Sequence, residues 1–514
     1  MTSETPADAQ HDDQPLEDRG NNRSQRPSSV AFREFMSSAW APRSGDGVTR
    51  HEAADHAAER RARLGARLTG QTLVIPAGSL KTRSNDTDYA FRPHAAFSHL
   101  TGLGTDLEPD AVLVLHALAA DAGPTHEAVL YTKPLAGRDS EEFYADSRYG
   151  EFWVGPRWTL EEAQELTGIR AAHIDDLRDA VAKDAGNPEV EVRVLRGADD
   201  AVATLVDVVL AEHGRWSEDA RDADDALATA VSELRLVKDA WEVDQLRAAV
   251  AATITGFEDV VRSLPRAAGH PRGERVVEGV FAARAREEGN AVGYDTIAAA
   301  GDHATTLHWI RNTGAVRPGE LLLLDAGVEV NSLYTADITR TLPVDGTFTD
   351  VQRRVYDAVR EAADAAFAVV RPGAKFRDVH AAAMEVLAAR LEEWGLLPVT
   401  AAESLTPEGQ QHRRWMPHGT SHHLGLDVHD CAQARAELYL DARLEPGMVF
   451  TIEPGLYFKA DDLAVPAEYR GIGVRIEDDV LVTADGYENL SAALPRRSED
   501  VEAWMARLSD GQGG

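Results

Sequence analysis

Four consecutive leucines lead directly into an aspartate at residues 321–325. A short run of large apolar residues is typical of a strand that is buried on both faces. A carboxylate at the end of such a strand is unfavourable to ionise unless it meets a cationic side chain or a metal ion. The fold must therefore cover both faces of this strand and also bring a partner to Asp325.

Four further candidate metal ligands lie in stretches with the character of strands: Asp337, His422, Glu453 and Glu477. Residues i and i+2 of a strand share a face. Asp337 therefore shares an entirely polar face with the threonines of residues 335–341. By the same rule Glu477 shares a face with Arg475 and Asp479, while Asp478 points to the opposite face. Each strand is predicted to have a polar face backed by an apolar one.

The histidine-rich stretch HGTSHHLGLDVH, residues 418–429, allows two interpretations. As a strand, it places His418 and His422 on one face and His423 on the other. As a helix, it would present a zinc-binding pair of histidines four residues apart. Glycines at positions 419 and 425 make a helix unfavourable here. The strand interpretation therefore selects His422 over His423.

Four carboxylates and one imidazole suit two divalent cations, so the five residues together indicate a two-metal hydrolase. Taken singly, each acid could equally be a hydrogen-bond or salt-bridge partner. Arg475 beside Glu477 could likewise form an ordinary cross-strand ion pair. Periodicity alone does not establish that the five strands meet.

The chain of 514 residues is longer than one hydrophobic core usually supports, so we expect two domains. The overall class is predicted to be α+β. Strands alternate with helices in residues 46–232, which predicts a smaller α/β N-terminal domain. In residues 233–505 helices and strands are grouped, which predicts the larger catalytic domain.

Helices are expected at residues 51–68, 235–264, 275–288, 350–370 and 376–394. Residues 1–45 and 506–514 have the composition of disordered tails. Residues 32–36 are also compatible with a short arm that docks on the protein.

Charge and cysteine content restrict the possible partners. The formal net charge of −33 disfavours binding to nucleic acid. No apolar run approaches the length that crosses a bilayer, and we expect no secretory signal and no membrane partner. The single cysteine, Cys431, allows no intramolecular disulfide and is interpreted as a packing residue. These features predict a cytoplasmic protein.

Several motifs occur in a fixed order: LHW at 307–309, LLLLDAG at 321–327, ADITRTLPV at 336–344, HGTSHHLGLDVHD at 418–430, LEPGMVFTIEPGLY at 444–457 and YRGIGVRIEDDVLVT at 469–483. In the first half, DTDYAFRPHAAFSHLTGL at 86–103 is followed by EPDAVLVL. With these motifs the chain resembles the proline-specific metallopeptidases of the pita-bread fold, and is most similar to the aminopeptidase P family. The resemblance covers most of the chain beyond residue 45.

The resemblance implies a pita-bread (creatinase/aminopeptidase-like) catalytic domain with two divalent metal ions. It makes Asp325, Asp337, His422, Glu453 and Glu477 the metal ligands. Asp337 and Glu477 would bridge the ions, with Asp325 on one ion and His422 and Glu453 on the other. The oxygen-rich set suits Mn²⁺, while Zn²⁺, Co²⁺ and Fe²⁺ remain open. A hydroxide activated by both ions would attack the scissile carbonyl.

The resemblance also implies a shell of residues around the metal ions. His308 would line the pocket on the proline side, and His418 and His429 would hydrogen-bond the substrate backbone or the developing oxyanion. Each of these histidines could instead be a satisfied core residue.

Two further roles follow from the same resemblance. Glu453 would also transfer a proton to the leaving nitrogen. Arg475 would hold Asp325, with Tyr457 nearby.

One departure from the family pattern is visible. The spacing from Asp325 to Asp337 is one residue longer than expected of bacterial relatives, which predicts an enlarged hairpin turn at residues 331–334. Both aspartates keep recognisable surroundings, so we expect the site to be preserved.

The expected activity is that of an Xaa-Pro aminopeptidase acting on peptides with proline in second position, in a homodimer or homotetramer. An Xaa-Pro dipeptidase (prolidase) with the same ligands is the nearest alternative. A catalytically inactive pita-bread binding module and a creatinase-like hydrolase of small amidines are disfavoured because all five ligands are present.

Overall fold

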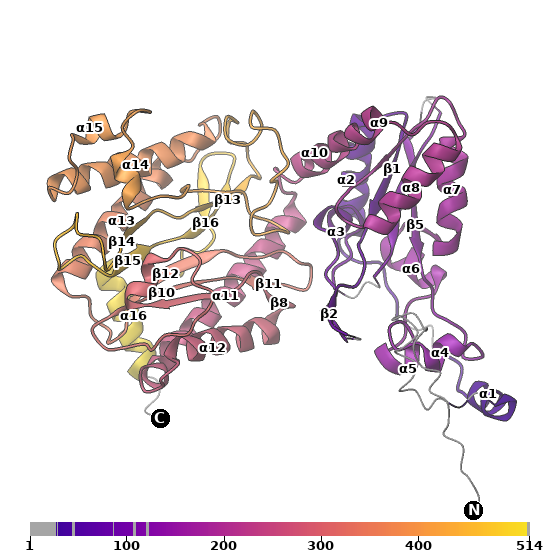
Figure 1. Cartoon of the computed structure of the whole chain (residues 1–514), viewed down its shortest axis with the longest axis horizontal. Coiled ribbons are helices and arrows are strands. Elements are labelled where there is room, and N and C mark those ends of the chain that lie inside the picture. The colour runs from indigo at the N-terminus through magenta and orange to yellow at the C-terminus, as the bar shows by residue number, and fades with distance from the viewer. Residues whose placement is uncertain are drawn as a thin grey trace, which may run out of the picture.

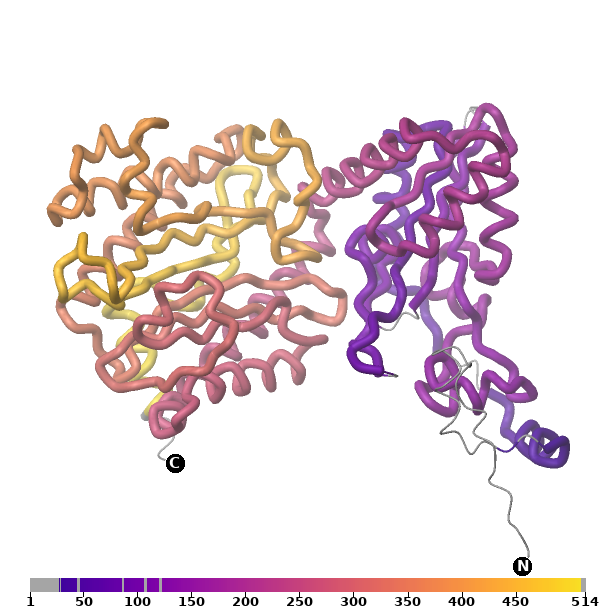
Figure 2. The backbone as a smooth tube through the Cα atoms, in the orientation of Figure 1, coloured from indigo at the N-terminus to yellow at the C-terminus, as the bar shows by residue number. Residues whose placement is uncertain are grey.

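The computed structural model describes residues 27, 29–43, 47–85, 87–105, 109–119 and 123–510. Two bodies lie side by side (Figure 1). We call residues 54–234 the N-terminal lobe and residues 240–510 the C-terminal lobe. The tube view shows that one continuous segment, around residue 235, connects them (Figure 2). In the part of the chain that is described, no helix combines the length and apolarity needed to cross a membrane.

The N-terminal lobe contains a five-stranded mixed sheet in the order β6-β5-β4-β1-β7. Strand β1 pairs antiparallel with β4 and parallel with β7. The strands of this sheet are β1 (Gln71–Pro76), β4 (Val112–Ala117), β5 (His126–Thr132), β6 (Arg170–His173) and β7 (Glu191–Val194). A separate hairpin comprises β2 (Thr82–Ser84) and β3 (Thr87–Asp88). The predicted α/β character of this lobe is confirmed.

Some helices of this lobe begin at capping side chains. Thr159 forms a capping box with Glu162, and Asp199 accepts from two N–H groups. The helices are α2 (Ala54–Arg67), α3 (Ala95–Thr101), α4 (Glu141–Ala145), α5 (Glu151–Val154), α6 (Leu160–Thr167), α7 (Leu177–Ala185) with the 3-10 turn η2 (Ile174–Asp176) before it, α8 (Asp200–Glu212), α9 (Glu218–Asp222) and α10 (Asp224–Leu234).

In the C-terminal lobe, strands lie between two groups of helices, with α13 and α14 on one side and α11 and α12 on the other (Figure 1). Capping boxes at Asp239 and Thr349 begin the long helices α11 and α13. The helices are α11 (Ala240–Ala268), α12 (Gly273–Glu288), α13 (Asp350–Val369), α14 (Phe376–Glu393), α15 (Ala401–Ser404) and α16 (Ser498–Asp510), with 3-10 turns η3 (Gly301–Thr305) and η4 (Gln411–Arg414). The predicted helices at 275–288, 350–370 and 376–394 are confirmed within two residues.

Short antiparallel sheets fill the middle of this lobe. Their strands are β8 (Ala291–Val292), β9 (Ile297–Ala300), β10 (Leu321–Ala326), β11 (Val328–Glu329), β12 (Ile338–Pro343), β13 (Val449–Ile452), β14 (Gly455–Phe458), β15 (Ile472–Arg475), β16 (Asp478–Val482) and β17 (Tyr487–Asn489). Strand β10 pairs with β12 on one edge and β9 on the other. The grouped helices and strands confirm the predicted α+β class.

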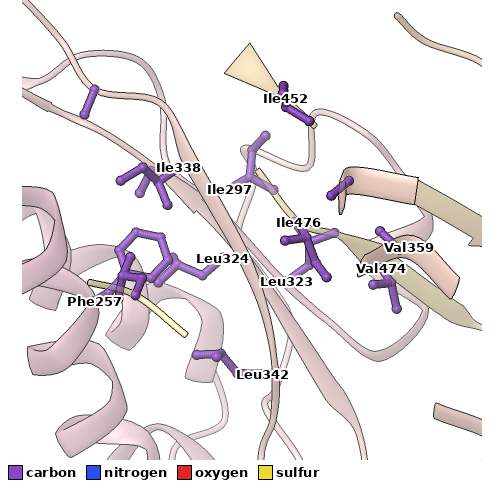
Figure 3. Close-up of a cluster of buried hydrophobic side chains, with 14 of the residues drawn as sticks. Phe257, Ile297, Leu323, Leu324, Ile338, Leu342, Val359, Ile452, Val474 and Ile476 are labelled. Carbon is purple, nitrogen blue, oxygen red and sulfur yellow. The ribbon is translucent and has the colours of Figure 1, made fainter. Parts of the chain in front are cut away.

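The leucine run forms β10 and is buried on both faces, as predicted. Leu324 lies beside Phe257 of α11, whereas Leu323 lies beside Ile476 on the other face (Figure 3). The exposed fraction of each of the four leucines is 3% or less. Burial of large side chains on both faces fixes the position of β10, and with it the position of Asp325.

The prediction of disordered tails is wrong for two stretches. Helix α1 (Val30–Ser37) lies within residues 1–45, capped by Ser29, and the ring of Phe32 meets Tyr144 at 5.4 Å between centroids. This contact agrees with a docking arm. At the other end, α16 continues through Asp510. Residues 1–26, 28, 44–46 and 511–514 lie outside the described residues.

Charged side chains connect the two lobes. Arg92 Nε of the N-terminal lobe donates to Glu329 Oε2 at 2.7 Å, and its Nη2 donates to the carbonyl of Leu426 at 2.5 Å. Arg60 of α2 donates twice to Asp239 Oδ2, at 2.9 and 2.7 Å. The lobes are therefore joined next to the chain segments that carry the candidate ligands.

His94 lies at this junction and caps helix α3. Its Nδ1 accepts the N–H of Ala96 at 3.2 Å, and its side chain lines a cavity of about 350 Å³ together with Lys81 and Arg92. Burial, reinforced by the positive charges of Arg235 and Arg92, lowers the pKa of His94 to about 4. The neutral ring is therefore the form that the folded protein holds.

We expect His94 to destabilise the protein in acid. A histidine in the unfolded chain has a pKa of about 6.5, so between pH 6.5 and pH 4 the unfolded state binds more protons and stability falls as the pH falls. Asparagine preserves a capping side chain without titrating. In His94→Asn, the decrease in unfolding free energy from pH 7 to pH 5, measured with urea, should be smaller by about 2 kcal/mol.

His173 supplies a matched control for this prediction. Its Nδ1 accepts the N–H of Asp175 in the same way, at 3.2 Å, but its side chain is 41% exposed. His173→Asn should retain the pH dependence of the parent protein. Equal pH dependence in the His94 variant and the parent would contradict the prediction.

Candidate metal centre

A cavity of about 530 Å³ in the C-terminal lobe collects the candidate ligands. All five predicted metal ligands line it, and so do the three predicted histidines and Arg475: Asp325, Asp337, His422, Glu453, Glu477, His308, His418, His429 and Arg475. Tyr457 is buried against this group, because its hydroxyl lies 2.7 Å from His418 Nε2 and 3.1 Å from Arg475 Nη1. The structure therefore brings together every residue that the sequence singled out.

The acidic residues lie close to the ends of strands. Asp325 is the last residue but one of β10, and Asp337 immediately precedes β12. Glu453 immediately follows β13, and Glu477 lies between β15 and β16. Asp325 therefore lies in a strand as predicted, whereas for Asp337, Glu453 and Glu477 the prediction of a strand through the residue is wrong in detail. Strand ends free the backbone to turn, so carboxylates from different strands can converge.

The stretch 418–429 was predicted as a strand and is instead extended chain with one isolated bridge, between His423 and Phe450. It still lies along β13, because Thr451 N–H donates to the carbonyl of His422 at 2.9 Å and Glu453 N–H donates to that of Thr420 at 2.8 Å. The side chain of His422 points into the cavity. That of His423 is wholly buried elsewhere, stacked on Phe376 at 4.9 Å.

Three of the ligands form the tightest group. Among the described residues, ligand atoms of Asp337, His422 and Glu477 all lie within 4.8 Å of one another. His422 Nε2 lies 3.2 Å from Asp337 Oδ2 and 3.5 Å from Glu453 Oε1. Asp325 adjoins this group through Tyr294, whose hydroxyl lies 2.7 Å from Asp325 Oδ1 and 2.6 Å from Asp337 Oδ1.

Burial and crowding of negative charge control the ionisation of the acids. Burial, followed by repulsion from Asp337 and Glu453, raises the pKa of Glu477 well above its ordinary value. Burial also raises the pKa of Glu453 to about 7, and it raises the pKa of Asp325. The positive charge of Arg475 opposes both shifts. The four carboxylates therefore lie in a site that a positive charge would stabilise.

Burial and the neighbouring charges also shift the pKa values of the histidines. Burial disfavours a proton on His422, but the hydrogen bond to Asp337 and the charge of Glu453 outweigh it and raise its pKa to about 9. Burial, followed by the charge of Arg475, lowers the pKa of His418 to about 3. Burial and the neighbouring His422 also lower the pKa of His429, whose ring meets that of His422 at 4.5 Å.

Arg475 organises the back of the cavity. Its Nη2 donates to Asp325 Oδ2 at 2.5 Å, its Nη1 to the Tyr457 hydroxyl at 3.1 Å, and its Nε to the Thr339 hydroxyl at 3.1 Å. Thr339 in turn donates to Glu477 Oε2 at 2.7 Å. One guanidinium thus orients two of the acids, directly and through a threonine.

The cavity contains a residue that the sequence did not single out. Tyr294, which bridges two candidate ligands, was missed because a tyrosine before a short strand gives no signal in strand periodicity. Asp479 is wholly buried, and its Oδ2 accepts the N–H of Asp337 at 3.2 Å. Asp478 faces away from the cavity, as predicted, and pairs with Arg340 at 2.7 Å.

The donor set fits two divalent cations. Four carboxylates balance the charge of two M²⁺ ions, and carboxylate-rich sites with one imidazole suit Mn²⁺ and related metals better than a structural zinc. The raised pKa values of three of the acids are the observation that supports this fit, because a cation would remove the repulsion that contributes to them.

Comparison with known proteins gives consistent results for both lobes. Residues 244–484 match the model of metallopeptidase family M24, and residues 57–192 match that of the aminopeptidase P N-terminal domain. Xaa-Pro aminopeptidase 1 of Streptomyces coelicolor is 53% identical over 92% of each chain. Xaa-Pro aminopeptidase of Escherichia coli is 33% identical over 85% of this chain and 94% of its own.

Solved structures show the same likeness. Aminopeptidase PepP of Pseudomonas aeruginosa superimposes with a TM-score of 0.75 at 29% identity, over 90% of this chain and 99% of that one. A zinc-substituted E. coli aminopeptidase P in complex with product gives a TM-score of 0.75 at 30% identity, over 89% and 99%. The pita-bread architecture predicted from the sequence is confirmed.

Proposed function

Because this chain belongs to metallopeptidase family M24 and carries the aminopeptidase P N-terminal domain, we propose that it removes the N-terminal residue from peptides whose second residue is proline. The protein is a metal-dependent hydrolase of the aminopeptidase P group. The observation that carries the proposal is the convergence of four carboxylates and His422 in one cavity that is large enough for a short peptide.

The ligand assignment is part of the proposal. Asp337 and Glu477 would be shared by two divalent ions, with Asp325 on one side and His422 and Glu453 on the other. Asp337 and Glu477 both belong to the group whose ligand atoms lie within 4.8 Å of one another, and this closeness supports a shared position for both. When bound, the ions would lower the pKa of a water molecule and polarise the scissile carbonyl. Mn²⁺ is the proposed metal.

Glu453 has the position of a group that moves a proton. Its carboxylate oxygens lie 3.5 Å from His422 Nε2 and 3.6 Å from His418 Nδ1. We propose that this proton goes to the leaving imide nitrogen.

His418 is held in a defined tautomer. Its Nδ1 lies 2.6 Å from the carbonyl of Gly419 and therefore carries the proton, which leaves Nε2 to accept from Tyr457. Tyr457 also accepts from Arg475 Nη1. Contact of His418 with the substrate would therefore involve an exchange of one of these partners.

His308 and His429 face the same cavity. We propose that His308 lines the pocket for the proline side of the substrate. His429 would donate to the substrate backbone or to the oxyanion that develops on the carbonyl oxygen.

A comparison of tripeptides with dipeptides tests the proposal. An X–Pro bond is a tertiary amide with a rigid ring, so cleavage of this bond is a distinct specificity. With Mn²⁺ supplied, Xaa-Pro-Yaa tripeptides should be cleaved with kcat/KM at least about tenfold above that for Xaa-Pro dipeptides, a difference of about 1.4 kcal/mol. An Xaa-Ala-Yaa peptide is the matched control and should be cleaved poorly.

The same assay distinguishes the alternatives. Cleavage of Xaa-Pro dipeptides alone would identify a dipeptidase. No hydrolysis and no bound metal after loading with Mn²⁺ would identify a binding module without activity, and hydrolysis of a small amidine instead of peptides would identify a creatinase-like enzyme.

The division into domains at 46–232 and 233–505, a cytoplasmic location and a homodimeric or homotetrameric assembly are also proposed. The resemblance to aminopeptidase P supports the assembly, the two lobes support the division into domains, and the single cysteine supports the location. Light scattering of the purified protein measures the assembly directly.

A further inference from the structure

Glu274 is a buried carboxylate that lies behind one wall of the cavity. It lies in the first turn of α12, and its side chain has an exposed fraction of 0%. It is absent from the candidate metal ligands and does not line the cavity. A carboxylate in such a place requires hydrogen-bond donors to compensate for the loss of water.

Four donors converge on this carboxylate, all from the segment 300–314. Oε1 accepts the N–H of Ala300 at 2.9 Å and lies 2.7 Å from His303 Nδ1. Oε2 accepts the indole N–H of Trp309 at 2.9 Å and the N–H of Gly314 at 2.5 Å. One side chain thus holds the start, the middle and the end of a single loop.

The end of the loop is fixed in both directions. Glu274 N–H donates to the carbonyl of Gly314 at 3.1 Å, so the two residues exchange hydrogen bonds. A Cβ atom added at Gly314 would lie 2.8 Å from the Glu274 carboxylate. The close approach therefore requires glycine at position 314.

The middle of the loop is held by a second contact. The rings of His303 and Trp309 stack at 3.8 Å between centroids with an interplanar angle of 26°. Both rings bond to Glu274, one to each carboxylate oxygen. The carboxylate and the stacked pair form a rigid unit directly beside His308.

The loop forms a wall of the cavity. Between its anchors, Leu307, His308 and Ile310 all line the cavity that holds the candidate ligands. We propose that Glu274 is a positioning residue for this wall, so that it sets where His308 and its apolar neighbours meet the proline side of the substrate. The substrate part of this inference rests on the proposed function.

Replacement of Glu274 by glutamine tests the idea with little change of shape. The amide offers one acceptor oxygen and an NH₂ group, which would face two N–H donors instead of accepting from them. We expect KM for an Xaa-Pro tripeptide to rise about tenfold or more, with kcat changed less than about threefold and with unchanged metal content. Trp309→Phe removes one donor and keeps an aromatic side chain, and it should give a smaller rise in KM. If the glutamine variant does not fold, the KM of Trp309→Phe tests the inference in its place.

A double-mutant cycle separates positioning from general damage. If Glu274 acts through the wall that carries His308, Glu274→Gln combined with His308→Ala should raise KM by less than the product of the two single effects.

Asp224→Asn is the matched control, since Asp224 is a buried carboxylate of the N-terminal lobe that accepts the N–H of Val194. It should lower thermal stability without changing KM.

Hydrogen–deuterium exchange provides a readout that does not depend on activity. In Glu274→Gln, amides of residues 301–314 should exchange faster while those of β10 remain protected. Unchanged exchange in this loop, or fully multiplicative effects on KM, would overturn the inference. If the parent protein cleaves no Xaa-Pro peptide but the loop exchange rises as expected, the proposed function fails and the positioning role stands.

Discussion

Replacement of Asp337 by alanine is expected to abolish peptide cleavage. Asp337 lies within reach of His422 and Glu477, and we propose that it is shared by both ions. Loss of a shared ligand removes several kcal/mol of charge stabilisation in the transition state, so kcat should fall at least about 1,000-fold. Steady-state kinetics and elemental analysis of the purified variant measure the two consequences, lost turnover and lost metal.

Asp295 provides the control for this experiment. It is another carboxylate that lines the same cavity, but it lies outside the predicted ligand set. Asp295→Ala should retain both metal ions, whereas Asp337→Ala should not. Full activity of Asp337→Ala, or equal loss of metal in both variants, would disprove the assignment of Asp337.

Removal of metal is expected to eliminate activity and to lower the thermal stability of the protein. Without cations, the four carboxylates, three of them buried and Glu453 partly buried, repel one another across the cavity, as the raised pKa values of Glu477 and Asp325 indicate. A ligand present at one hundred times its Kd stabilises the folded state by about 2.7 kcal/mol. Mn²⁺ added to chelator-treated protein should therefore restore cleavage and raise Tm by roughly 5–10 °C.

The stability readout makes this prediction specific. Asp337→Ala should show little rise in Tm with Mn²⁺, because its binding site is incomplete. Cleavage that survives dialysis against a strong chelator would contradict the metal-dependent mechanism, and so would an equal rise in Tm for the parent and the variant.

Local patterns predicted much of the fold. The long helices were placed within a few residues, because periodic apolar spacing and capping residues such as Thr349 act over a few positions of chain. The leucine run predicted a strand buried on both faces, and β10 is such a strand. Strand alternation also distinguished His422 from His423, although the stretch itself is not a strand.

Other features depend on contacts that local patterns do not encode. The helix α1 was missed because its aromatic contact, Phe32 with Tyr144, joins residues far apart in the chain. The strands end at the acidic residues because the chain turns there toward the cavity. Tyr294 and Glu274 gave no signal in the sequence, since their partners come from other segments.

The sequence by itself determined which residue types are available: five ligands suited to divalent cations, on strands with apolar backing, in the motif order of a known family. Only the tertiary structure decided that these residues share one cavity, that Arg475 and Tyr294 orient the acids, and that Glu274 holds the wall beside His308. The physical reason is that strand and helix periodicity arise from neighbours along the chain. Convergence of charges from β10, β12, β13 and the β15–β16 connection depends instead on how separate segments pack.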